Sequence, residues 1–190
     1  MRGSSLTNER TATGALAAYS AKRDEARARL EREVVELFEQ FRSRLLRYLA
    51  TFGLPVQDGE EVIQEVFLAL FQHLARGKSR ENLRAWLFRV AHNLALQRRV
   101  KTLRAVDAMD GEFESTDPAP SAEARMIDAQ SRQRVRAVVA ALGEQDRSCL
   151  ALRAEGLRYR EIAKILEISL GAVSISLARS LARIARAVER

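Results

Sequence analysis

Cysteine and long apolar runs are the scarcest features of this 190-residue sequence. Cys149 is the only cysteine, so no disulfide can form within the chain. The longest uninterrupted apolar runs, VFLALF and AVVAAL, are each six residues long, whereas a membrane-spanning helix needs about 20. The first residues also lack the apolar core of a secretory signal. These absences predict a cytoplasmic protein with no membrane contact.

Proline and aromatic residues are few as well. The sequence has three prolines and 6% aromatic residues, and the abundant Ala, Leu, Arg and Glu favour helices. With 47% apolar and 30% charged residues the chain can bury a core, which excludes a wholly disordered protein. We therefore predict an all-α fold of two small helical domains. The formal net charge of +7 favours a nucleic-acid partner, the alternative being an arginine-rich surface that only aids solubility.

The chain divides at one stretch of contrasting composition. Residues 105–122 contain two of the three prolines and no basic residue, which is typical of a flexible linker. The same stretch holds five acids: Asp107, Asp110, Glu112, Glu114 and Asp117. This composition predicts a first domain at 21–104 and a second at 123–190, after a disordered tail at 1–20.

Apolar residues recur every three or four positions in the first domain and predict three helices. The first begins near Ala21 and ends at Gly53 and Pro55, because proline cannot continue a helix. Asp58 is the candidate N-cap of the second helix. The third helix ends in a basic run: Arg98, Arg99, Lys101 and Arg104.

The second domain contains a helix-turn-helix pattern. Helices are predicted at 122–142 and 144–155, followed by YREIAKILE and LGAVSISLARSLARIARAVER with only IS between them. Glu167 occupies the turn position where a left-handed backbone favours glycine, and Ser169 can cap the second helix. That helix is uncharged over 168–177. Its basic residues come later and share one face, as either phosphate contacts or a solubilising stripe: Arg179, Arg183, Arg186 and Arg190.

The two halves together resemble bacterial sigma factors. Residues 35–104, with DGEEVIQEVFLALF and NLRAWLFRVAHNLALQRR, resemble conserved region two, and 130–188, with LRAEGLRYREIAKILEIS, resemble region four. The short linker without a third domain is similar to that of the extracytoplasmic-function (ECF) group. The resemblance implies a protein that binds core RNA polymerase and promoter DNA and directs promoter recognition, melting and transcription initiation. It implies no active site and no cofactor, and it adds an anti-sigma factor as a partner.

The resemblance also implies where each partner binds. In the family, the first motif docks on the clamp coiled coil of the largest polymerase subunit, and the flap of the second-largest subunit is a further contact. The matching polar positions for the clamp are Asp58, Glu60, Glu61, Gln64 and Glu65. An acidic helix face suits an arginine-rich partner, although the same pattern without the resemblance describes an ordinary solvated face.

For the minus-ten promoter element, the resemblance implies a loop at 77–84 that receives a flipped base of the non-template strand. The matching loop and helix positions are Lys78, Ser79, Arg80, Asn82, Arg84, Arg89, Asn93, Arg98, Arg99 and Lys101. We expect Trp86 in the core rather than as a platform for a base.

For the minus-thirty-five element, the matching residues lie on the last helix: Ser174, Ile175, Ala178, Arg179 and Arg183. Where the family has a run similar to GTVKSRLxRA, this chain has GAVSISLARS, so serine replaces both basic residues and the reading surface is altered at 174–176. Ile175 could touch a thymine methyl group or belong to a protein-binding patch. Region four therefore either reads DNA with unusual base choice or docks on a protein.

Two other classes of protein fit less well. A stand-alone helix-turn-helix regulator needs a dimer surface, and no spare apolar stripe supplies one. An enzyme needs a reactive constellation, but His73 and His92 lie far apart in the sequence and the only cysteine lies near neither. No metal site and no glycine-rich phosphate loop is predicted.

Overall fold

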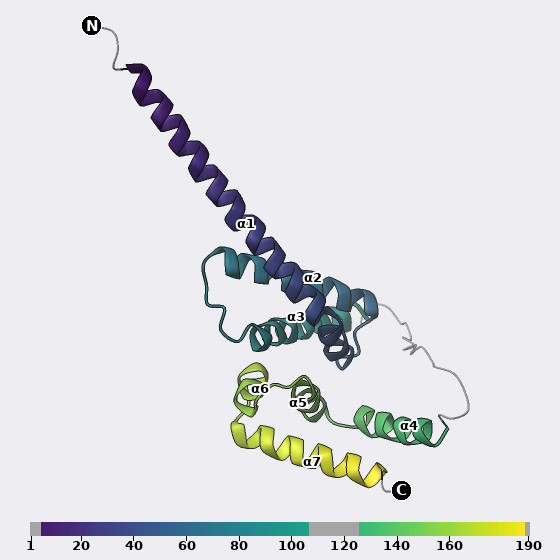
Figure 1. Ribbon diagram of the computed structural model, residues 1–190. Helices are drawn as coiled ribbons and strands as arrows, with labels where there is room; N and C mark the ends of the chain where they lie inside the picture. The colour runs from purple at the N-terminus through teal and green to yellow at the C-terminus, as the bar shows by residue number, and fades with distance from the viewer. Residues whose placement is uncertain (1–4, 107–125, 189–190) are drawn as a thin grey trace.

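The computed structural model describes the backbone of residues 5–106 and 126–188, and the side chains of 20–101 and 133–188. Most of the predicted linker therefore lies outside the described residues. Within these ranges every regular element is a helix, in the order α1 (Ser5–Ala50), α2 (Val56–Ala75), α3 (Leu83–Val106), α4 (Met126–Ala140), α5 (Glu144–Ala154), α6 (Tyr159–Leu166) and α7 (Leu170–Val188) (Figure 1). The all-α prediction is confirmed.

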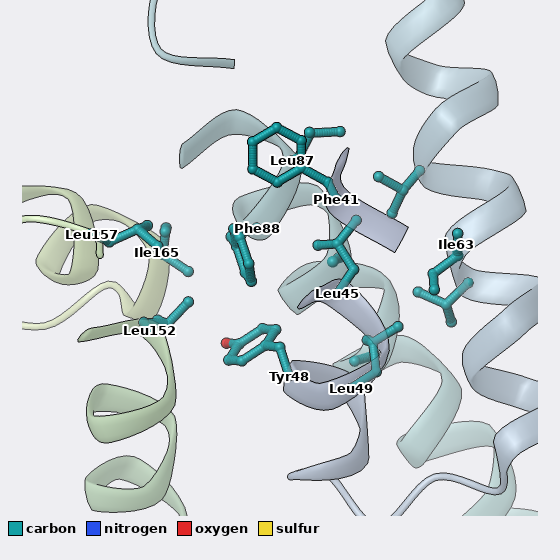
Figure 2. Packing of buried hydrophobic residues seen from close by; sticks show 14 of the residues in the cluster. Phe41, Leu45, Tyr48, Leu49, Ile63, Leu87, Phe88, Leu152, Leu157 and Ile165 are labelled. Atoms are coloured by element: carbon teal, nitrogen blue, oxygen red, sulfur yellow. The ribbon is translucent and has the colours of Figure 1, made fainter. Parts of the chain in front are cut away.

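The first half of the molecule is built by α1, α2 and α3. The last four turns of α1 contribute Leu45, Tyr48 and Leu49 to a core in which these side chains are at most 1% exposed. Ile63 of α2 and Leu87 of α3 close this core from the other sides (Figure 2). The apolar spacing that predicted the helices is thus the spacing of their buried faces.

The N-terminal part of α1 differs from the sequence-based expectation. The helix begins at Ser5 and not near Ala21, so it runs through most of the segment predicted to be a disordered tail. That segment is rich in alanine and lacks proline, so no residue in it forces the helix to end. In Figure 1 this part of α1 projects away from the other helices.

The start of α2 corrects the predicted N-cap. Pro55 holds the cap position with φ −54° and ψ 149°, and its carbonyl accepts the Gly59 N–H at 3.0 Å. Asp58 lies one turn inside the helix, where its charge still faces the positive end of the helix dipole. The reason is that proline is well suited to a helix start, since it has no N–H to leave unpaired.

The second half contains the predicted helix-turn-helix. The axes of α6 and α7 are bent by 105° across a break of a few residues. Glu167 at the turn is left-handed, with φ 55° and ψ 38°, and the Ser169 hydroxyl accepts the Ala172 N–H at 3.1 Å. Both turn predictions are confirmed. The helices predicted at 122–142 and 144–155 are observed as Met126–Ala140 and Glu144–Ala154, and residues 122–125 lie outside the described ones.

The two halves pack directly against each other. Leu152, Leu157 and Ile165 of the second half point toward Tyr48 and Phe88 of the first, and all five are at most 2% exposed (Figure 2). One continuous apolar cluster therefore spans both halves.

Polar contacts surround this apolar junction. Glu155, at the end of α5, accepts Arg44 Nε at 2.6 Å through its carboxylate and Arg44 Nη2 at 2.7 Å through its backbone carbonyl. Arg99 pairs with Glu144 at 2.7 Å. Gly156, which follows Glu155, has φ +82°, and a Cβ atom there would lie 3.2 Å from Arg84 Nη1. Glycine is thus favoured twice at this junction, by backbone conformation and by space.

Candidate polymerase and promoter surfaces

The acidic face of α2 is engaged by arginines of the same chain. Arg98 of α3 donates to Glu61 at 2.6 Å and to Glu65 at 2.8 Å. Hydrogen bonds from these two carboxylates raise the pKa of Arg98. Glu60 forms an ion pair with Arg42 of α1.

The five predicted clamp-binding positions therefore fall into two groups. The glutamates Glu60, Glu61 and Glu65 have partners within the chain, while Gln64 is exposed and Asp58 is half-buried. Surface ion pairs of this kind are weak and exchange readily with a charged partner. The face is thus a preformed charged surface with an apolar element that sequence reasoning missed.

That element is Leu68, whose side chain is 59% exposed on α2. It lies four residues after Gln64 and three after Glu65, so all three share one helix face. The spacing was visible in the sequence, but Leu68 sits inside the run VFLALF, whose other large members are wholly or partly buried. An exposed leucine among polar groups can lose its contact with water when a partner covers it, as residues at the centre of an interface do.

The predicted minus-ten loop lies between α2 and α3. Lys78, Ser79, Arg80 and Asn82 are all exposed. Ser79 O lies 2.9 Å from His73 Nε2, and Arg80 Nε donates to Glu33 at 3.1 Å. These bonds tie the middle of the loop to α2 and α1.

Asn82 has two structural roles at the start of α3. Its backbone is left-handed with φ 54°, and its side-chain oxygen accepts the Ala85 N–H at 3.4 Å. Its amide nitrogen donates to Glu161 of α6 at 2.7 Å. Burial raises the pKa of Glu161, but hydrogen bonds from the Arg158 N–H and the Asn82 amide outweigh it and lower the pKa overall. The amide of Asn82, one of the predicted minus-ten loop residues, is thus occupied by an acid of the second half.

A cavity of about 240 Å³ adjoins this contact. Its first-half wall includes Asn82, Trp86 and Arg89, and its second-half wall includes Arg160 and Lys164. Trp86 is half-buried, packs on the core and stacks against His73 with ring centroids 4.8 Å apart. The expectation that Trp86 belongs to the core is confirmed in part, since one side of it also lines the cavity.

The other predicted minus-ten residues are dispersed. Arg98 faces the acids of α2, Arg99 faces Glu144, and Arg84 approaches Gly156. Asn93 and Lys101 are exposed along α3. The structure brings together only the loop, Trp86 and Arg89, so the basic run after Asn93 is a separate surface. The Arg104 side chain lies outside those described.

The leading face of α7 is exposed and uncharged, as the sequence indicates. Ile175 is 64% exposed, and Ser174 and Ala178 are exposed beside it. Arg179 and Arg183 follow on the adjoining side and are also exposed. All five predicted minus-thirty-five residues therefore lie on the accessible side of the helix.

Ser176, by contrast, is not part of the reading surface. It is fully buried, and its hydroxyl donates to Asp146 Oδ1. The expectation that 174–176 all form altered reading surface is therefore wrong at this position. Ser176 lies three residues after Val173 and four before Ser180, and both of those are buried. This helical spacing could have placed Ser176 on the buried side of the helix.

Asp146 is the residue that organises this end of the second half, and sequence reasoning missed it. Arg179 donates to it from Nε at 2.9 Å and from Nη2 at 2.8 Å, a bidentate pair. Burial raises the pKa of Asp146, but the bonds from Arg179 and Ser176 outweigh it and hold the pKa below its usual value. The guanidinium of Arg179 is thus fixed in orientation by a nearly buried carboxylate.

Among the described residues no helix is by itself long and apolar enough to cross a membrane, and the one bent pair of that length and composition is α6 with α7. No group of three or more His, Cys, Asp or Glu side chains in the described part could hold a metal ion.

Comparison with known proteins identifies the family. Sigma-70 region 2 matches residues 37–105, and sigma-70 region 4 matches residues 132–184. The sequence is 32% identical over 129 residues to the ECF RNA polymerase sigma-E factor of Escherichia coli, covering 63% of this chain and 68% of the relative. It is 28% identical over 160 residues to the RNA polymerase sigma-H factor of Pseudomonas aeruginosa, covering 79% of this chain and 83% of that protein.

Solved structures show the same fold. The sigma factor RpoE of Bartonella quintana, in complex with the anti-sigma factor NepR, is similar with a TM-score of 0.61 and 19% identity, over 81% of this chain and 97% of that one. CnrH in complex with the cytosolic domain of CnrY gives a TM-score of 0.55 and 22% identity, over 86% and 94%. The matched regions define a sigma-70-type transcription initiation factor, and the chain belongs to the ECF group of sigma factors.

Proposed function

We propose that this sigma factor binds core RNA polymerase through the exposed face of α2, opens the minus-ten element with the loop before α3, and places α7 on upstream DNA. The observation that carries the proposal is the position of these surfaces. The α2 face and the leading face of α7 are exposed on separate halves (Figure 1), so polymerase and upstream DNA can be held at the same time.

The α2 surface fits the clamp coiled coil of the largest subunit. Its glutamates already accept arginine guanidinium groups, which is the chemistry expected of a basic partner. Leu68 supplies an apolar contact beside Gln64 and Glu65 of this polar face. An apolar contact ringed by polar groups is the usual arrangement of a protein interface.

The minus-ten loop must be uncovered before it can receive a base. Glu161 holds the Asn82 amide, and Arg160 and Lys164 line the opposite wall of the cavity. Binding of single-stranded DNA at this loop therefore requires that α6 moves away and that the bond between Asn82 and Glu161 breaks. We attribute the separation to polymerase, which would bind the two halves at different places, the second near the flap of the second-largest subunit.

An anti-sigma factor would favour the opposite state. Two solved relatives with the same fold are held in complexes with anti-sigma factors. A protein that binds the closed arrangement seen here would keep the loop covered and stabilise that state by mass action. The site of action would be the cytoplasm, where polymerase and DNA are found.

Binding to core polymerase tests the proposal. Leu68→Ala should weaken the affinity on the order of tenfold, as truncation of a central interface residue does. Val35 of α1 is also 59% exposed, so Val35→Ala is a control of equal exposure and should bind as the wild type does. Equal affinities for both variants would place the polymerase surface elsewhere.

A further inference from the structure

The leading face of α7 lacks every side chain that reads a base by paired hydrogen bonds. In DNA-binding helices, Arg or Lys reads guanine, Asn or Gln reads adenine, and Asp or Glu reads cytosine. None of these six residue types occurs over residues 168–178. The exposed residues of the first turns are Gly171, Ser174, Ile175 and Ala178, and apolar side chains of this kind contact the methyl group of thymine.

Arg179 is the first charged residue of the helix, and its guanidinium already pairs with a carboxylate of the same chain. Its Nε and Nη2 donate to the two oxygens of Asp146 at 2.9 and 2.8 Å. Asp146 is itself fixed by the buried Ser176. The Nε–Nη2 edge of the guanidinium is therefore occupied and cannot form a bidentate pair with guanine. The N–H groups that remain on Nη1 and Nη2 suit bonds to phosphate oxygens.

Ile175 stands apart from the other exposed apolar residues of α7. With 3.6 residues per turn, Leu181 lies about 120° around the helix from Ile175, and Leu170 and Val188 lie about 140° away. The immediate neighbours of Ile175 on its own face are small or basic: Gly171, Ala178 and Arg179. A protein-binding patch would need contiguous apolar area, whereas a single aliphatic side chain between small residues and arginines fits a groove bounded by phosphates.

We propose that Ile175 is a specificity residue that reads the methyl group of a thymine in the upstream promoter element, while Arg179, positioned by Asp146, holds a phosphate. The inference rests on the proposed function, since it assumes that α7 meets DNA in the polymerase complex. It predicts an upstream element whose essential base is thymine.

Replacement of thymine by uracil tests this directly, because it removes one methyl group and leaves base pairing unchanged. Core polymerase with the full chain is first given a promoter library, and the upstream thymines of an active template are then replaced one at a time. At one or two positions uracil should lower open-complex formation about three- to fivefold, the effect of one lost methyl contact.

Variants assign the effect to a residue. With Ile175→Ala, templates with thymine and with uracil at those positions should form open complex equally well. Leu181→Ala, which truncates another exposed residue of α7, should retain the difference. Arg179→Ala should lower open-complex formation by the same factor for all upstream sequences.

Three other results would overturn the proposal. If upstream sequence matters but uracil is tolerated at every thymine, methyl readout is wrong. If initiation is independent of upstream sequence, α7 is held by protein, and the sigma function stands. If no template is opened, the proposed function fails together with this inference.

Discussion

Removing the Glu155 carboxylate should weaken the contact between the two halves of the chain. The Glu155 side chain is only 11% exposed and pairs with Arg44, itself 29% exposed, and with Arg47, which is 65% exposed. Breaking a fully buried pair costs about 3–5 kcal/mol, and water screens this partly open one. We therefore expect Glu155→Ala to reduce the free energy of association of the halves by about 1–3 kcal/mol, a shift of roughly 5- to 150-fold toward the separated state.

A distance measurement between the halves reports this shift. Spin labels at exposed positions, introduced as Gln72→Cys on α2 and Ala185→Cys on α7, would give one narrow distance distribution in the closed protein. The native Cys149 is fully buried and should not react with the label. Glu155→Ala, and also the charge-reversed Glu155→Arg, should broaden and lengthen the distance distribution, and added salt should do so weakly in the wild type.

Two controls separate this contact from a general loss of stability. Arg27→Ala removes a wholly exposed ion pair with Glu31 on α1, and it should leave the distance unchanged. Combining Arg44→Glu with Glu155→Arg should restore the closed distance in part, because the charges are exchanged but Arg47 still faces the new arginine. If Glu155→Arg leaves the closed distance intact, or if the exchange restores none of it while the helices remain folded, the Glu155 contact does not hold the halves together.

Two further predictions concern His92 and Asn93. Burial lowers the pKa of His92 below 6.5, partly opposed by Glu144 and Glu167. The unfolded chain therefore binds this proton at higher pH than the folded chain does, so the midpoint of thermal unfolding should fall as pH drops below about 6.5. His92→Gln should flatten that decline and the His73→Gln control should not; identical slopes would contradict the assignment. Asn93→Ala should reduce the amount of open complex, measured as permanganate-reactive DNA, on the order of tenfold. The affinity for polymerase, measured by anisotropy, should stay equal to that of the Gln40→Ala control. A loss of affinity for polymerase instead would assign Asn93 to the polymerase-binding surface.

The helical architecture could be predicted from the sequence because its signals are local. Apolar spacing marked the buried faces, Gly53 and Pro55 marked the end of α1, and the short turn with Glu167 and Ser169 marked the helix-turn-helix. Each of these signals acts within one or two helical turns. The predicted cap at Asp58 was wrong because Pro55, three residues earlier, already starts the helix.

The partners of the site residues could not be predicted, because they are distant in sequence. Asp146 meets Arg179 across 33 residues, and Asn82 meets Glu161 across 79. The first pair depends on how α5 packs against α7 and the second on how the two halves pack, and helical periodicity specifies neither. A long-range pair also changes the interpretation of a residue: the sequence offered Arg179 as a phosphate contact or part of a solubilising stripe, and the structure pairs it with the Asp146 carboxylate.

Run-off transcription by core RNA polymerase on a promoter library, with and without this chain, is the most direct test of the proposed sigma function. That function requires the chain to confer initiation at defined start sites that share a minus-ten sequence, and Leu68→Ala should lower this initiation while Val35→Ala should not. Failure to open any template, although the chain is folded and the polymerase active with another sigma factor, would contradict the proposed function.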